Sequence, residues 1–204
     1  MSPRETTAPN RADQLRRRVA EQNVAAILDA AGAQLERDPN FSLVQIAKAA
    51  GVSRPTLYAH FPTREDLIEA AVRRALDETE RDIDAASIDD GTPTEALERL
   101  ITTGWESLAR HLTIARLALD LLPPERLREI HRGALEPVRR LITRGQRAGE
   151  FRKDQPVEWM VSVLYALLHA AADDVMGRRI ARGAAGEYIT SSTLGAFGSA
   201  SSAR

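Results

Sequence analysis

The sequence contains no cysteine, which excludes disulfide bonds, catalysis by a thiol and zinc sites built from cysteine ligands. Aromatic residues make up only 4% of the chain, while hydrophobic residues as a whole reach 43%. Such a core must be largely aliphatic and rich in alanine and leucine, a composition that favours helices. We find no segment with the alternation of a β-strand and no internal repeat. The sequence therefore predicts an all-α fold.

Long hydrophobic runs are also missing. The longest apolar stretch, Trp159 to Ala172, is interrupted by Ser162 and His169. It is shorter than the roughly 20 residues that a membrane-spanning helix needs. The first ten residues contain no apolar run, so we predict no signal peptide. From these features we expect a soluble, cytoplasmic protein.

Catalytic motifs are absent from the sequence as well. It has no nucleophile elbow, no glycine-rich phosphate loop, and no cluster of carboxylates or histidines at a catalytic spacing. His169 and Asp173 lie four residues apart, but two ligands alone do not make a metal site. We therefore predict that the protein is not an enzyme and needs no cofactor or metal ion.

The net charge of −1 gives no indication of nucleic-acid binding, but the distribution of charge does. Residues 1–64 contain nine lysines and arginines against six acidic residues. Residues 65–204 contain nineteen basic residues against twenty-three acidic ones. A basic excess confined to one part of a chain is typical of a surface that binds the phosphate backbone, which places such a surface in the first third.

Residues 42–64 have the pattern of two short helices joined by a tight turn. The first half carries apolar residues at helical spacing, namely Leu43, Ile46, Ala47 and Ala50. Gly51 follows, where a left-handed residue ends a helix without steric cost. Ser53 is placed to cap the next helix, and Pro55 falls in its first turn. The pattern predicts a helix-turn-helix, whose second helix (about Ser53 to Phe61) enters the major groove of DNA.

The same stretch resembles the tetracycline-repressor (TetR) family of transcription regulators. The resemblance is carried by IAKAA followed by GVSRPTLYAHFPTREDL and covers roughly residues 18–76. It implies a flexible arm over residues 1–17, a helix-turn-helix DNA-binding domain over 18–76, and a helical ligand-binding and dimerisation domain over 77–204. It also implies a homodimeric repressor that responds to a small-molecule effector and binds an inverted-repeat operator.

We expect DNA contacts from the residues on and around the second helix, namely Ser42, Ser53, Arg54, Pro55, Thr56, Tyr58, His60 and Arg64. Arg54 can contact guanine through two hydrogen bonds, or it is simply a solvated helix start. Thr56 contacts thymine or phosphate, or its only role is local, in the helix cap formed by Ser53. The resemblance implies phosphate contacts for Tyr58 and His60, with packing against a neighbouring helix as the alternative. A positive charge is unfavourable at the start of a helix. A phosphate contact is therefore the better explanation for an arginine at position 64.

The helix expected at about residues 157–179 is apolar on nearly all sides and must be covered on most of them. The same surface of a second subunit is the most economical cover. The resemblance agrees, because TetR-family proteins dimerise through their last two helices, here about 157–179 and 187–197.

Polar residues in the C-terminal part indicate a ligand site less strongly. Tyr165, His169 and Asp173 form one polar stripe, which is either the wall of a ligand cavity or a hydrogen-bonded row at the dimer interface. Arg116, if buried, needs either Asp120 or an acidic ligand as a partner. We expect an apolar or amphipathic ligand to contact Trp105, Arg116, Tyr165 and His169, although a tryptophan such as Trp105 belongs more often to a core.

Four further expectations concern helix boundaries and function. We predict a connecting helix from Thr63 to about Asp82 and one long amphipathic helix from Pro123-Pro124 to Ala148. Residues 182–186 are predicted to be a Gly/Ala linker before the last helix. The alternative to DNA binding is a helical binding module whose helix-turn-helix docks a protein partner.

Overall fold

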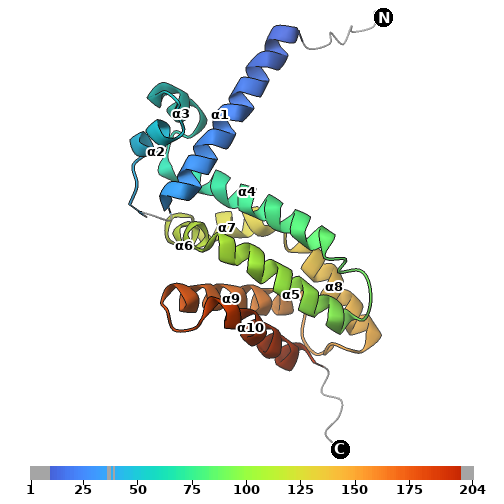
Figure 1. Cartoon of the computed structure of the whole chain (residues 1–204). Helices are drawn as coiled ribbons and strands as arrows, with labels where there is room; N and C mark the ends of the chain where they lie inside the picture. The colour runs from blue at the N-terminus through green and yellow to red at the C-terminus, as the bar shows by residue number, and fades with distance from the viewer. Residues whose placement is uncertain (1–9, 36–37, 39, 199–204) are drawn as a thin grey trace, which may run out of the picture. The chain divides into compact units, whose positions relative to one another are not determined.

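The structure is a computed structural model that describes residues 10–35, 38 and 40–198. Over these residues the chain forms ten α-helices and no strand, with a single isolated bridge between Phe151 and Gly198 (Figure 1). This confirms the predicted all-α class. The helices divide into two compact units, Met1–Ala71 and Val72–Arg204. Part of the predicted arm lies outside the described residues, and from Arg11 onward its remainder is helical.

The first unit contains three complete helices and the start of a fourth, namely α1 (Arg11–Leu35), α2 (Leu43–Ala49), α3 (Arg54–His60) and α4 (Arg64–Ala85). Helix α2 packs against both α1 and α3. The core between them is almost wholly aliphatic and is made of Ile27, Ala31, Leu35, Phe41, Ile46, Ala47, Leu57, Phe61, Leu67 and Ile68. Helix α3 is too short to be stable by itself. Its position is therefore fixed by the side chains that it buries in this small core.

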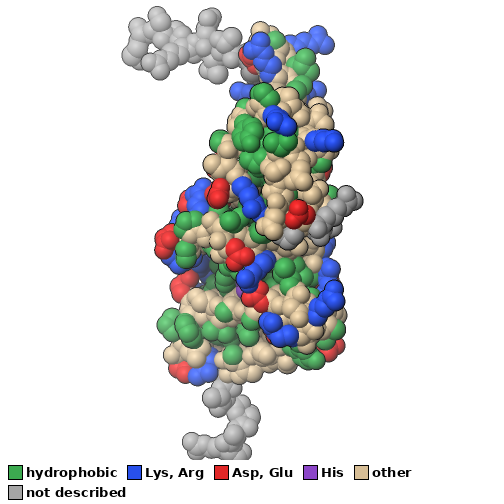
Figure 2. Space-filling view, turned by 90° about the vertical axis from the view of Figure 1, so that its left-hand side faces the viewer, with side chains coloured by type: hydrophobic (Ala, Val, Ile, Leu, Met, Phe, Trp, Pro, Cys, Tyr) green, Lys and Arg blue, Asp and Glu red, His purple; other side chains and the backbone are tan. Residues whose placement is uncertain are grey.

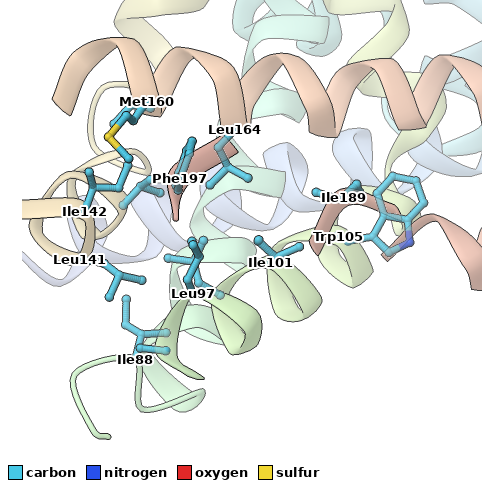
Figure 3. Packing of buried hydrophobic residues seen from close by; sticks show 14 of the residues in the cluster. Ile88, Leu97, Ile101, Trp105, Leu141, Ile142, Met160, Leu164, Ile189 and Phe197 are labelled. Carbon is cyan, nitrogen blue, oxygen red and sulfur yellow. The ribbon is translucent and has the colours of Figure 1, made fainter. Parts of the chain in front are cut away.

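The second unit holds the rest of α4 and six further helices, namely α5 (Pro93–Arg110), α6 (Leu112–Leu121), α7 (Pro124–His131), α8 (Glu136–Ala148), α9 (Val157–Met176) and α10 (Arg182–Phe197). Helices α8 and α10 each pack against both α5 and α9. Figure 3 shows side chains from these helices meeting in one cluster, with Ile101, Leu164 and Ile189 among them. The rings of Phe151 and Phe197 add an edge contact at 6.2 Å between centroids.

Two predicted boundaries in the second unit are wrong. The single long helix expected after Pro123 is two helices, because Pro137 lacks the N–H of a helix interior and instead occupies the first turn of α8. The predicted linker at residues 182–186 is the first turn of α10. Burial of Ala185, which has no exposed surface, outweighs the weak helix propensity of the glycines beside it.

Helix α9 is, among the described helices, the one long and apolar enough to cross a membrane by length and composition, with a mean hydropathy of 1.2. Core helices of soluble proteins meet the same criteria. The buried side chains of Met160, Val161 and Leu164 place one face of α9 in the core of the second unit.

A glycine in α8 allows one of the closest contacts in this core. A methyl group at Gly145 would lie 2.0 Å from a ring carbon of Phe151, which is 1% exposed. We predict that Gly145→Ala lowers the free energy of unfolding by about 1–3 kcal/mol, because the buried ring has no room to move. Urea denaturation followed by circular dichroism measures this change.

The matched control is Gly104→Ala in the interior of α5, where an added methyl group meets no atom within 4 Å. That variant gains helix propensity and should be more stable by up to about 1 kcal/mol. Equal effects of the two substitutions would contradict the packing explanation.

Candidate functional site

The two helices of the helix-turn-helix are capped as the sequence predicts. The backbone N–H of Gln45 donates to Ser42 Oγ at 3.3 Å, and the N–H of Ser42 donates to Gln45 Oε1 at 2.7 Å. Gly51 has a φ of 69°, the left-handed conformation expected at the end of α2. Ser53 Oγ accepts from the N–H of Thr56 at 3.2 Å. These local bonds fix where α3 begins.

The outward face of α3 carries most of the predicted DNA-binding residues. Leu57 is completely buried against α2, which turns Arg54, Pro55 and Tyr58 outward, and Tyr58 is 45% exposed. The hydroxyl of Thr56 lies 2.7 Å from that of Ser53, so the two side chains form one hydrogen-bonded pair at the helix start. The face is therefore polar and accessible, the requirement for entering a groove.

Two of the predicted phosphate-binding residues, at the end of α3 and shortly after it, are less exposed than Tyr58. His60 is half-buried, and its ring lies 6.3 Å from that of Phe61. The guanidinium of Arg64 lies 4.8 Å from the centre of the Phe41 ring, which is a cation–π contact. Figure 2 shows more basic than acidic side chains around α1, at the top of the view. This agrees with the basic excess of residues 1–64.

The second unit contains a partly open cavity of about 130 Å³ between α4, α5, α6, α7, α8 and α9. Most of its lining is aliphatic, and none of the described residues that line it is Asp, Glu, Lys or Arg. Polar groups come from only six side chains, namely Thr79, Ser107, His111, His131, Tyr165 and His169. Such a cavity suits an apolar molecule with few polar groups.

Three of these side chains form an aromatic cluster at one wall of the cavity. The rings of Tyr165 and His169 lie 4.1 Å apart between centroids, and the ring of His131 meets Tyr165 edge-on at 5.2 Å. The Nδ1 atoms of His131 and His169 lie 2.8 and 3.0 Å from the carbonyl oxygens of Leu127 and Tyr165. A more open groove of about 810 Å³ shares His131 and Tyr165 with the cavity.

Comparison with known proteins identifies the family. Residues 27–71 match the family model described as bacterial regulatory proteins, tetR family. The transcriptional repressor LfrR of Mycolicibacterium smegmatis is 32% identical over 161 residues, which cover 78% of this chain and 83% of LfrR. The chain belongs to the TetR family.

Two further comparisons support this assignment. The transcriptional regulator NfxB of Pseudomonas aeruginosa is 28% identical over 143 residues, which cover 66% of this chain and 73% of NfxB. A crystal structure of LfrR in complex with proflavine has a TM-score of 0.66 at 28% identity and covers 86% of this chain and 96% of LfrR. As a TetR-family member, the chain is a DNA-binding transcription regulator and not an enzyme.

The structure gives the four predicted ligand-binding residues different surroundings. Tyr165 and His169 line the cavity, whereas Trp105 and Arg116 lie outside it. Trp105 is 5% exposed in the core, and its indole N–H donates to the carbonyl of Arg182 at 3.2 Å (Figure 3). Arg116 is half-exposed at its side chain and pairs with both Asp120 and Asp173, which together satisfy its charge. Ligand binding itself stays a prediction for all four residues.

The sequence reasoning missed two histidines of the cavity, His111 and His131. A signal was present, because the chain has only four histidines and three of them line this one cavity. Both missed residues lie at helix ends, where periodicity does not show which way a side chain points. His111 Nε2 lies 3.1 Å from a carboxylate oxygen of Glu78, so it is tied to α4.

Burial lowers the pKa of both His131 and His169 below the ordinary value of 6.5, and the backbone carbonyls bound to their Nδ1 atoms offset part of this shift. The unfolded chain therefore binds more protons than the folded chain just below pH 6.5. We predict that the free energy of unfolding falls as the pH decreases from 7 through 6.5 toward the lowered pKa values, by at most about 1.4 kcal/mol per pH unit for each histidine.

Urea denaturation at a series of pH values, with the wild type compared against the double variant His131→Phe and His169→Phe, measures this dependence. The carboxylates common to both proteins cancel in the difference. An unchanged slope in the double variant would show that the two histidines are not the source.

Proposed function

We propose that this regulator is a ligand-responsive homodimeric repressor that places one α3 helix per subunit in the major groove of an inverted-repeat operator. The observation that carries this proposal is the division of α3 into a buried Leu57 and an exposed face with Arg54, Pro55 and Tyr58. The proposed layout assigns residues 18–76 to DNA binding and residues 77–204 to ligand binding and dimerisation. It also assigns residues 1–17 to an arm.

The proposed roles on the DNA follow from exposure and chemistry. Arg54 is exposed at the first position of α3, where its planar guanidinium can donate two hydrogen bonds to guanine. Tyr58, His60 and Arg64 contact phosphates, and the Phe41 ring beneath Arg64 pre-orients its guanidinium. Ser42 and one hydroxyl of the Ser53–Thr56 pair donate hydrogen bonds to the backbone of the DNA, because the hydrogen bond between Ser53 and Thr56 uses the hydrogen of the other hydroxyl.

Exposed aromatic and apolar side chains on the last two helices support the dimer. Trp159 and Met176 on α9 are 57% and 41% exposed, and Tyr188 on α10 is 54% exposed. Large exposed apolar side chains are typical of a protein contact, and a two-fold axis lets the same surface cover itself. A dimer formed through α9 and α10 also explains why α9 is apolar on nearly all sides in a protein that we propose to be cytoplasmic.

The cavity in the second unit is the proposed effector site. LfrR has been crystallised with proflavine, a planar aromatic molecule, which supports an aromatic effector for this chain as well. Pockets for drug-sized ligands usually measure roughly 300–1,000 Å³, whereas this cavity measures about 130 Å³. A large effector would extend into the adjoining groove or move the surrounding helices. It regulates DNA binding only if it binds one arrangement of the protein better than the other.

Two arginines separate phosphate contact from base recognition. Arg64→Ala should weaken binding to specific and random DNA alike. It should also reduce the slope of log affinity against log salt concentration by about one for each phosphate that the protein no longer binds. Arg54→Ala should instead relax base preference at one position per half-site, at a cost of roughly 1–3 kcal/mol. Fluorescence anisotropy with operator and random duplexes over a salt series measures both effects.

The matched control is Arg140→Ala, which removes an exposed arginine from α8 in the second unit and should change neither quantity. An Arg54→Ala variant that loses affinity with unchanged sequence preference would contradict the base contact. The alternative, a helix-turn-helix that docks a protein partner, predicts binding that does not change with salt concentration or with substitution of Tyr58 or Arg64.

A further inference from the structure

The polar groups that line the cavity fall into two sets. At one side, Thr79 donates to the carbonyl of Ala75 at 2.9 Å, and its oxygen lies 2.7 Å from that of Ser107. Ser107 Oγ also accepts from Arg110 at 3.1 Å, and His111 Nε2 is bound to Glu78. These groups already have protein partners, and a ligand gains nothing by replacing them.

The second set is the cluster of His131, Tyr165 and His169. A carbonyl oxygen only accepts hydrogen bonds, so the Nδ1 atoms bound to Leu127 and Tyr165 must both carry hydrogen. In the neutral imidazole, Nε2 is then the acceptor. Among the described residues we find no hydrogen-bond partner for these two Nε2 atoms or for the Tyr165 hydroxyl. The residues that carry these two acceptors and this hydroxyl line the otherwise apolar cavity, and His131 and Tyr165 also line the adjoining groove.

This arrangement selects a ligand by its chemistry. The two Nε2 acceptors need a hydrogen-bond donor, and the Tyr165 hydroxyl can donate to the same ligand group. A hydroxyl on an aromatic ring does both. The lining described above has no charged side chain to balance an ionised ligand, whose burial without a partner is costly. A cavity of about 150 Å³ in a protein core is known to hold benzene, so about 130 Å³ suits a single ring.

We infer that the cavity binds an uncharged hydroxylated aromatic molecule, whose hydroxyl group donates to Nε2 of His131 or His169 and accepts from Tyr165. This inference rests on the proposed function, because it specifies the effector class of the same cavity. It differs from an amphipathic ligand with a charged head, and it assigns specificity to His131, which no sequence pattern singled out.

Phenol and toluene test the inference, because they have nearly the same shape and differ by one hydroxyl group. In a cavity without free polar groups, toluene binds more tightly, since a buried unpaired hydroxyl costs roughly tenfold or more in affinity. In the wild-type protein without DNA, we expect phenol to bind more tightly than toluene at neutral pH. Isothermal titration calorimetry with the full chain measures both affinities.

Variants assign the preference to the cluster. The double variant His131→Phe and His169→Phe should reverse the order, so that toluene binds more tightly than phenol. The matched control His111→Phe removes a cavity imidazole whose Nε2 is already bound to Glu78, and it should keep the wild-type order. Because the two probes are compared in the same protein, partial loss of folding affects both alike.

Three results would overturn the inference. The first is that the wild-type protein binds toluene more tightly than phenol, or binds neither probe. The second is that the double variant still binds phenol more tightly than toluene. The third is that the wild-type protein binds benzoate more tightly than phenol. None of these measurements involves DNA or dimer formation. If the ligand inference fails, the repressor proposal is therefore unaffected. If the protein prefers phenol but does not bind operator DNA, only the repressor proposal is overturned.

Discussion

The burial of Leu57 is the interaction on which the proposed DNA-binding surface depends. Helix α3 has only seven residues, and a helix of that length is not stable in water by itself. Leu57 and Ile46 are completely buried between α3 and α2, which compensates for the short length. Ser53 then satisfies a free backbone N–H at the start of α3. The exposed face of α3 is therefore rigid because its opposite face is packed.

In the cavity of the second unit, buried contacts fix the orientation of polar side chains in a similar way. Buried hydrogen-bonding groups need partners, and the lining meets this requirement for Thr79, Ser107 and His111. For His131 and His169, the carbonyl one turn earlier in the same helix satisfies Nδ1 and thereby sets which nitrogen accepts. The ligand specificity that we propose thus follows from helix geometry, because each acceptor is fixed by its own backbone.

Local signals in the sequence predicted the first unit well. The capping box of Ser42 and Gln45, the left-handed Gly51 and the cap at Ser53 each depend on neighbours within a few residues, and the structure confirms them. The resemblance built on this segment led to the correct family.

The second unit was less predictable because its features depend on contacts between distant helices. Periodicity showed that Trp105 faces inward, but not that it packs on α10 instead of lining the cavity. Arg116 has its partners 4 and 57 residues away, and only the folded chain shows that both are present. The break between α7 and α8 is signalled by Pro137, which lies in the first turn of α8. A proline at that position outweighs a continuous apolar stripe.

The central claim is that two copies of α3 act together on DNA, and the selection of binding sites from random duplexes tests it most directly. The account predicts that the full-length protein selects an inverted repeat, with half-site centres about 34 Å apart or a multiple of that distance. Each half-site should show one guanine position whose preference depends on Arg54. Recovery of asymmetric single sites, bound by one copy of the chain, would contradict the account.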